Sequence, residues 1–171
     1  MTVRRPIVAG LTPGAGTSTL AAALHGHDGG TLYGRPDRLD VLVCRCDERS
    51  LLRVGALATE ATRPVLALAL DPAGRGLAGY DPALRARLGA RFGGVVVLPG
   101  VPRWRDRDAR AEAAVVLGKP GHTLSRPLRT YAAALRQLTA ALLGTGALNR
   151  ATAPLVVIGH PAGTAHLRRT G

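Results

Sequence analysis

The sequence contains one lysine, Lys119, against 22 arginines. Aromatic residues are also scarce at 3% of the chain, so aliphatic side chains must fill any hydrophobic core. The apolar share of 46% is enough for a sizeable core, and 171 residues are most simply one domain. Any site that requires a lysine side chain from this chain must therefore use Lys119.

Cysteine is nearly absent, since the chain has only Cys44 and Cys46. Two cysteines are too few for a disulfide framework or for a four-cysteine zinc site. In a strand they would point to the same face, and we expect both to be small core residues. The five histidines show no ligand spacing with a third donor. We therefore predict no metal site from cysteine and histidine.

Long hydrophobic runs are missing as well. A membrane span needs about 18 uncharged apolar residues, and the densest stretch, residues 132–148, is interrupted by Arg136 and Gln137. After Val3, Arg4 and Arg5, the apolar run is too short for a secretory leader. We expect a soluble, cytoplasmic protein without a membrane span.

The formal charge of +12 leaves two interpretations open. A basic chain can bind a polyanion, such as nucleic acid, an acidic membrane surface or an acidic protein. Alternatively, the charge reflects the arginine-rich, lysine-poor composition of a GC-rich genome, because the arginines are spread along the chain. The arginines that surround Trp104 are the best nucleic-acid candidate, although acids in the same segment would neutralise some of them: Arg85, Arg87, Arg91, Arg103, Arg105, Arg107 and Arg110.

Short aliphatic runs alternate with helical patterns along the chain. Nearly continuous apolar runs are typical of parallel strands that are buried on both faces. The predicted strands are residues 6–10, 41–46, 65–70, 95–98 and 155–158, with a weaker one at 31–33. The predicted helices are residues 18–25, 49–61, 82–92, 107–117 and 125–143. This alternation predicts an α/β, doubly wound, mostly parallel sheet of about five to six strands with helices on both faces.

A glycine-rich loop follows the first predicted strand. Residues 7–20 read IVAGLTPGAGTSTL, in which an apolar run leads into glycines, then hydroxyls, then a helix. Strand, glycine-rich turn and helix N-terminus form the layout of a phosphate-binding loop. The lysine that follows the last glycine in such loops is replaced here by Thr17. A simpler alternative is that Gly14 and Gly16 only let the chain turn tightly.

With this loop, the chain resembles the ParA/MinD family of deviant-Walker ATPases. The family's loop reads Lys-Gly-Gly-Val-Gly-Lys-[Ser/Thr]-Thr, and the matching stretch here, residues 12–19, reads TPGAGTST with threonine in both lysine positions. Residues 95–102 resemble the family's strand that ends in Ile-Pro, and residues 118–120 resemble its Gly-Lys-Pro-like turn. The resemblance extends to small actinobacterial proteins encoded near conjugation or secretion genes. It implies a three-layer P-loop NTPase-like domain over residues 1–171, with 150–171 as a last strand and a loose tail.

Several catalytic parts of that family are missing. The interval between Leu24 and Asp40 is too short for the family's two strands and its Asp-x-x-Pro-x-Gly switch II segment. Asp71 stands where the family has an adenine-contacting Asn. Arg45 and Arg49 are the best substitutes for the lost lysines, although the planar guanidinium differs from a compact ammonium. Because phosphoryl transfer depends on positioned charge, we expect weak or no hydrolysis and predict no catalytic residues.

The resemblance implies a nucleotide site for ATP with Mg²⁺, in which Ser18 would contact the metal. Backbone N–H groups of the loop could still bind an anion. The predicted binding residues are Gly14, Ala15, Gly16, Thr17, Ser18, Thr19, Asp71 and Pro99.

These features predict a degenerate ParA/MinD-like protein that acts as an assembly or positioning module. Its partner would belong to a DNA-transfer (conjugation), partition or secretion machine, and a homodimer is one assembly that the resemblance allows. The alternative function is a basic nucleic-acid-binding module on the same fold, without nucleotide binding.

Overall fold

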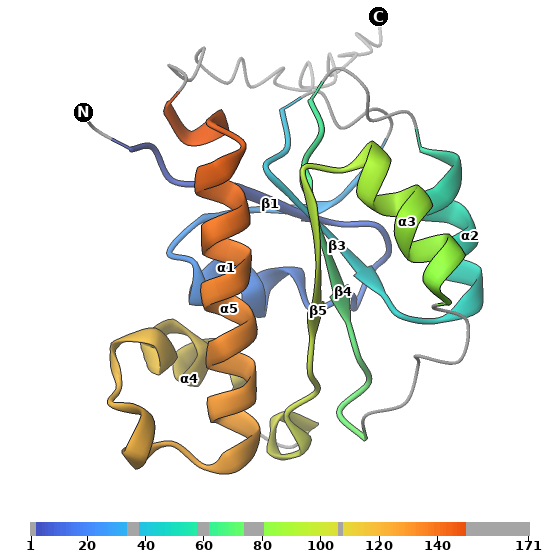
Figure 1. Cartoon of the computed structure of the whole chain (residues 1–171). Helices are drawn as coiled ribbons and strands as arrows, with labels where there is room; N and C mark the ends of the chain where they lie inside the picture. The colour runs from blue at the N-terminus through green and yellow to red at the C-terminus, as the bar shows by residue number, and fades with distance from the viewer. Residues whose placement is uncertain (1–2, 34–37, 58–61, 74–80, 106–107, 150–171) are drawn as a thin grey trace, which may run out of the picture.

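The computed structural model describes residues 3–33, 38–57, 62–73, 81–105 and 108–149. Five parallel strands form one sheet in the order β2-β1-β3-β4-β5 (Figure 1). The strands are β1 (Ile7–Gly10), β2 (His27–Thr31), β3 (Val41–Arg45), β4 (Val65–Ala69) and β5 (Gly94–Leu98). The strand predicted at 155–158 and the predicted tail lie outside the described residues.

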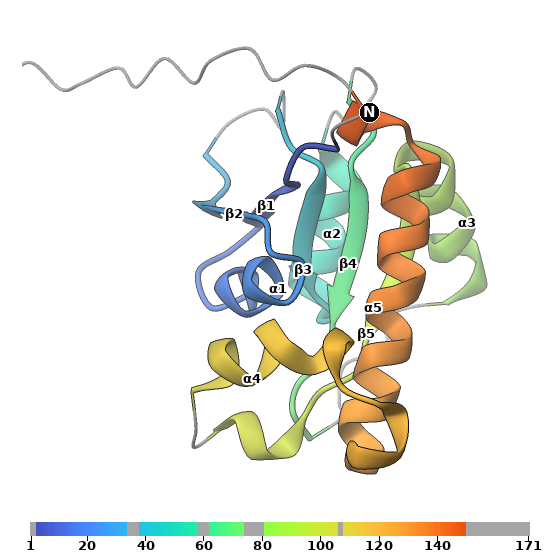
Figure 2. The ribbon, with the colours of Figure 1, turned by 90° about the vertical axis from the view of Figure 1, so that its left-hand side faces the viewer.

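Five α-helices cover the two faces of this sheet. One face carries α1 (Thr17–Ala23), α4 (Ala109–Val115) and α5 (Arg126–Gly144), and the other carries α2 (Glu48–Ala56) and α3 (Pro82–Arg91) (Figures 1 and 2). The predicted doubly wound α/β architecture with helices on both faces is therefore confirmed. The strand order reverses between β1 and β3, since β2 lies on one side of β1 and β3 lies on the other.

The central strands are buried on both faces, which explains their continuous aliphatic sequences. In β3, Val41 and Val43 face the helices α1, α4 and α5, whereas Leu42 and Cys44 face α2 and α3. Cys44 and Cys46 belong to the same cluster and are both free and buried, as the sequence predicts. The two clusters are separate layers of one core that meet at the sheet.

The helix boundaries follow their capping residues. Asp47 and Asp81 precede α2 and α3, and their carboxylates accept the backbone N–H of Ser50 and Leu84 at 2.9 and 2.7 Å. The predicted helix 49–61 ends earlier, at Ala56, and residues 58–61 lie outside the described residues. The helix predicted at 107–117 is an α-helix only from Ala109 to Val115 and continues as a 3-10 helix, η2 (Val116–Gly118).

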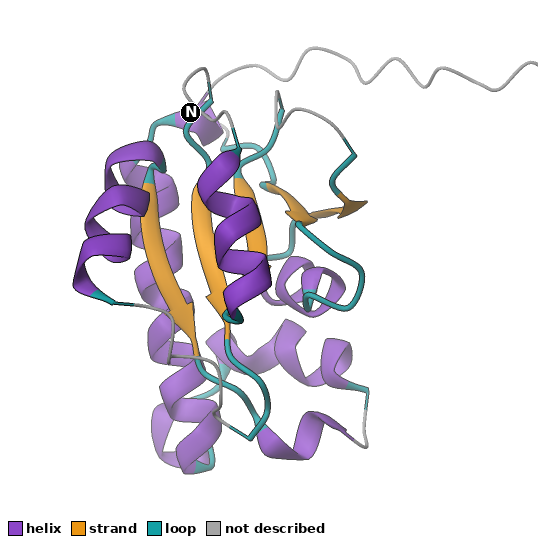
Figure 3. Ribbon diagram, turned by 90° about the vertical axis from the view of Figure 1, so that its right-hand side faces the viewer, coloured by secondary structure: helices purple, strands orange, loops and turns teal. Residues whose placement is uncertain are grey.

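The weak strand prediction at residues 31–33 was wrong in position. The strand is β2, with sequence HDGGT, so only Thr31 is shared with the prediction. Among the described strands β2 lies at the outer edge of the sheet (Figure 3) and pairs with β1 alone. Its residues are largely exposed. An exposed edge strand needs no apolar run, and hydrophobic pattern could not reveal it.

The longest helix, α5, has 19 residues. Neither it nor any other helix in the described residues combines the length and apolar character that a membrane-spanning helix requires.

Candidate functional site

A cavity of about 310 Å³ opens at the carboxyl ends of the strands. Its walls come from the loops after β1, β4 and β5, from the ends of β3, β4 and β5, and from three helices. Ligands of open α/β sheets bind at this edge, where the strand order reverses. The lining residues are Gly14, Ala15, Gly16, Thr19, Leu20, Val43, Arg45, Ala69, Leu70, Asp71, Pro72, Leu98, Pro99, Gly100, Val101, Trp104, Ala109 and Tyr131.

Hydrogen bonds between neighbouring strands hold these loops together. The Leu11 N–H donates to the Val43 carbonyl at 2.8 Å, and the Leu70 N–H donates to the Leu98 carbonyl at 2.9 Å. Gly100 lies directly against the Asp71 carbonyl and Pro72, where a Cβ atom would have no room. A glycine at position 100 therefore lets the loop after β5 approach the loop after β4.

The glycine-rich loop turns at two glycines with left-handed backbone. Gly14 has φ of 73° and Gly16 has φ of 92°, a conformation that costs other residues strain. The Ala15 N–H donates to the Thr12 carbonyl at 3.3 Å, so this amide is already used inside the loop. In the first hydrogen bond of α1, the Leu20 N–H donates to the Gly16 carbonyl. The N–H groups of Thr17, Ser18 and Thr19 come before this bond in the chain and have no acceptor within the helix. These three amides, together with those of Gly14 and Gly16, are the loop's candidate anion donors, and of these residues Gly14, Gly16 and Thr19 line the cavity.

Thr17 and Ser18 do not line the cavity. Thr17 is buried, and its hydroxyl occupies the space that a side chain at Gly10 would need. Ser18 lies instead beside Asp28 of β2, and its hydroxyl lowers the pKa of that carboxyl, helped by the Gly30 N–H at 3.0 Å and by Arg110. The hydroxyl predicted to contact magnesium thus lies close to a carboxylate.

Two charged side chains are found among the described residues that line the cavity, the cation Arg45 and the anion Asp71. Arg45 ends β3, and its Nε atom lies 3.7 Å from Oδ2 of Asp47, with about half of the side chain exposed. Asp71 follows β4, accepts the Ala73 N–H at 2.5 Å and lies 3.6 Å from the guanidinium of Arg105. The structure therefore brings the predicted lysine substitute Arg45 together with Asp71 and the loop glycines.

Two aromatic side chains close one wall. The rings of Trp104 and Tyr131 meet edge to face, with centroids 4.7 Å apart. The indole N–H of Trp104 donates to Glu112 at 2.6 Å, which fixes the ring, and burial raises the pKa of the Tyr131 hydroxyl. Tyr131 is one of the buried residues of α5, and the helical spacing of these residues does not indicate that its ring also borders a cavity.

The other basic residues lie elsewhere. Arg49 and Lys119 do not line the cavity. Arg4 precedes β1 and donates to the carboxylate of Asp40 at the opposite end of the sheet. Of the eight predicted binding residues, six lie at the cavity, namely Gly14, Ala15, Gly16, Thr19, Asp71 and Pro99.

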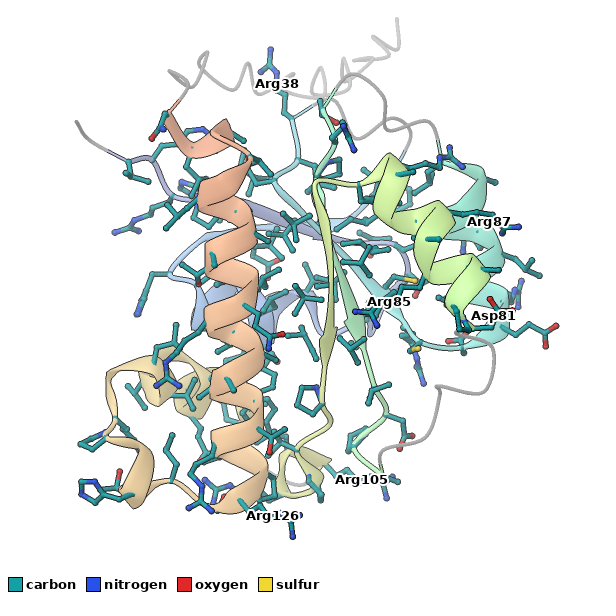
Figure 4. The ribbon with its side chains drawn as sticks, in the orientation of Figure 1. Arg38, Asp81, Arg85, Arg87, Arg105 and Arg126 are labelled. Atoms are coloured by element: carbon teal, nitrogen blue, oxygen red, sulfur yellow. The ribbon has the colours of Figure 1, made fainter. Side chains whose placement is uncertain are left out.

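The arginines near Trp104 do not form a single surface. Arg85 and Arg87 lie on α3, whereas Arg105 lies beyond the carboxyl end of β5 (Figure 4). Arg103 pairs with Glu112, and Arg105 lies beside Asp71. Arg107 lies outside the described residues. Because Trp104 is packed on Tyr131 and bonded to Glu112, it is poorly placed to stack on a base.

Within the described residues, no three histidine, cysteine or acidic side chains gather as a metal site. No family model matches the sequence, and neither curated proteins nor solved structures provide a match.

Proposed function

We propose that the carboxyl-edge cavity binds a phosphate-bearing ligand, with ATP as the nucleotide that the resemblance indicates. The observation that carries this proposal is that the glycine-rich loop and Arg45 border the same cavity. The loop contributes backbone amides, which attract anions without any side chain, and Arg45 contributes a full positive charge. Ligand pockets usually measure about 300–1,000 Å³, so this one suits a compact ligand or part of a larger one.

Efficient hydrolysis is not part of the proposal. Catalysis of phosphoryl transfer requires several cations around the transferred group, and among the described residues that line this cavity Arg45 is the one cation. Asp71 adds a negative charge there, which disfavours a highly charged ligand unless Mg²⁺ accompanies it. We therefore propose a binding module whose ligand changes its assembly, in keeping with a positioning role in DNA transfer, partition or secretion.

The only tryptophan provides a direct test, because Trp104 borders the cavity. ATP, ADP and inorganic phosphate would each be titrated with and without Mg²⁺ while tryptophan fluorescence and heat are recorded. We expect saturable binding of ATP, and at least tenfold weaker binding in Arg45→Gln, since a hydrogen bond to a charged group contributes about 1.5–3 kcal/mol. Phosphate release should stay at the rate of a blank.

Arg85→Gln is the matched control, because Arg85 lies on α3, on the face that α1 and α5 do not cover (Figure 4). It removes the same charge and should leave the affinity unchanged. Absence of any binding at millimolar ATP, or equal losses in the two variants, would refute the proposal.

The alternative, nucleic-acid binding, is supported mainly by the charge of +12. It predicts affinity for DNA that falls steeply with salt. The divided arginines and the packed Trp104 favour the cavity instead.

A further inference from the structure

A second large depression lies on the opposite face of the sheet, between α2 and α3. It has a volume of about 780 Å³ and is bordered by apolar and small side chains that include Leu51, Leu52, Gly55 and Leu84. A smaller depression of about 370 Å³ continues it, and the two share Gly55 and Arg87. Together they form a groove along the helix pair, which we call the α2/α3 groove.

The two helices are tied together, so the groove has fixed walls. The guanidinium of Arg91, near the end of α3, donates to the carbonyls of Gly55 and Leu57 at the end of α2. Both helices follow strands of one parallel sheet and therefore run in the same direction (Figure 1).

Leu52 is a large apolar side chain that is exposed at the edge of the groove. It is the middle residue of α2, and 68% of its surface is exposed although it borders an apolar groove. A large aliphatic side chain that projects beside a hollow can fill a matching hollow on another surface. The apolar part of the groove therefore offers both a projection and a recess.

Charge is divided along the same surface. Asp47, Glu48 and Asp81 stand at the end where the helices begin. Two of the groove's lining residues are arginines that lie further along, Arg87 in the second half of α3 and Arg91 at its end. Arg49 of α2 and Arg85 of α3 stand nearer the acidic end but do not line the groove. Figure 4 shows Asp81 and Arg87 separated in this way along α3. The lining side chains of the groove therefore have acids at one end, arginines toward the other end and Leu52 between them, an order that is complementary to its own antiparallel copy.

We propose that the α2/α3 groove is the interface of a homodimer, covered by the same groove of a second copy. A two-fold axis that passes near Leu52 places the acidic end of each copy against the basic part of its partner. The same contact in parallel would oppose like charges. The opposed charges attract locally, against the long-range repulsion between two molecules that each carry a charge of +12. The proposal does not depend on the carboxyl-edge cavity, which other elements form.

The first test is sedimentation equilibrium of the full chain from 1 to 200 μM, with no nucleotide present. We expect a dimer, and Leu52→Glu should raise the dimer dissociation constant at least tenfold. Leu143→Glu is the matched control, because Leu143 is a similarly exposed leucine (55%) on α5. Circular dichroism would verify that both variants fold. A wild-type monomer throughout, or equal dissociation by the two variants, would overturn the proposal.

A second test addresses the antiparallel pairing. Glu48→Arg and Arg87→Glu each place like charges across the proposed axis, so each variant alone should dissociate at least tenfold more readily. Mixed in equal amounts, they should form a heterodimer, because both opposed pairs are then restored. A mixture that stays as monomeric as its components would reject the antiparallel interface.

Discussion

Arg4 and Asp40 form a two-pronged ion pair, with Nη1–Oδ2 and Nη2–Oδ1 distances that are both 2.7 Å. Asp40 is only 3% exposed, and its carboxylate also accepts the Ile7 N–H at 2.8 Å. Arg4 donates further to the Ala147 carbonyl at 3.1 Å. The pair thus connects the segment before β1, the start of β3 and the segment after α5.

We predict that Asp40→Asn lowers the free energy of unfolding by about 2–4 kcal/mol. Removing one member of a buried pair leaves the other charge without compensation, an effect of roughly 3–5 kcal/mol when both are buried, and Arg4 is partly exposed. Urea unfolding would measure the loss. Arg5→Gln, on the neighbouring exposed residue, should change stability by less than about 0.5 kcal/mol. An unchanged urea midpoint in Asp40→Asn would contradict the prediction.

The contact between Gly10 and Thr17 predicts a coupled pair of substitutions. Gly10→Ala should destabilise the fold by about 1–3 kcal/mol, because its methyl group would enter the space of the Thr17 hydroxyl. Thr17→Ala vacates that space, so the double variant should be more stable than the sum of the two losses predicts. Denaturant unfolding of all four proteins gives the coupling energy, expected near 1 kcal/mol. Additive losses would show that the two side chains do not compete.

Cys44 predicts a loss of stability at alkaline pH. Burial raises the pKa of its thiol to about 12. The unfolded chain releases this proton at a lower pH, near the ordinary thiol pKa of about 8.5. Stability is therefore complete below that pH and declines as the pH rises toward 12. Urea unfolding between pH 8 and pH 10.5 should show this decline in the wild type and a shallower one in Cys44→Val. Parallel curves would disprove the assignment to Cys44.

Ser18 and Asp28 predict a measurable change at acidic pH. The Ser18 hydroxyl is the main cause of the lowered pKa of Asp28, so Ser18→Ala should raise that pKa toward the ordinary value. Because the folded-state pKa is lowered, the ionised carboxylate stabilises the fold above the unfolded pKa, and this is lost as the pH falls. A carbon-detected NMR titration of the Asp28 carboxyl measures the shift. Thr19→Ala should leave it unchanged, and an equal shift in both variants would implicate the helix end instead of the hydroxyl.

The sequence predicted the four strands whose aliphatic residues are required by burial on both faces of the sheet. Strands β1, β3, β4 and β5 are aliphatic because helices cover both of their faces. Since parallel strands end at one edge, residues as distant as Gly14, Arg45, Asp71 and Pro99 could be expected together there, and all four line one cavity.

What the sequence could not predict depends on contacts with β2. That strand has no apolar signal, so the proximity of Ser18 to Asp28 was hidden. The inward turn of Thr17 likewise depends on the absence of a side chain at Gly10. The sequence therefore predicted that the loop residues lie at the carboxyl edge of the sheet. It could not predict where the hydroxyls of Thr17 and Ser18 point, because packing against Gly10 and β2 decides this.

β2 has a further consequence for how copies of this chain meet. Its outer edge presents backbone groups that could recruit another strand, as the edges of flat apolar sheets do. The strand is short and polar, includes two glycines, and its pairing with β1 shifts register between Val8 and Gly10. A register shift of this kind increases the local twist of the strand, so its edge is less suited to pair with another strand. Within the described residues β2 is the last strand at this edge, and its short, irregular backbone makes it a poor template for the addition of another strand.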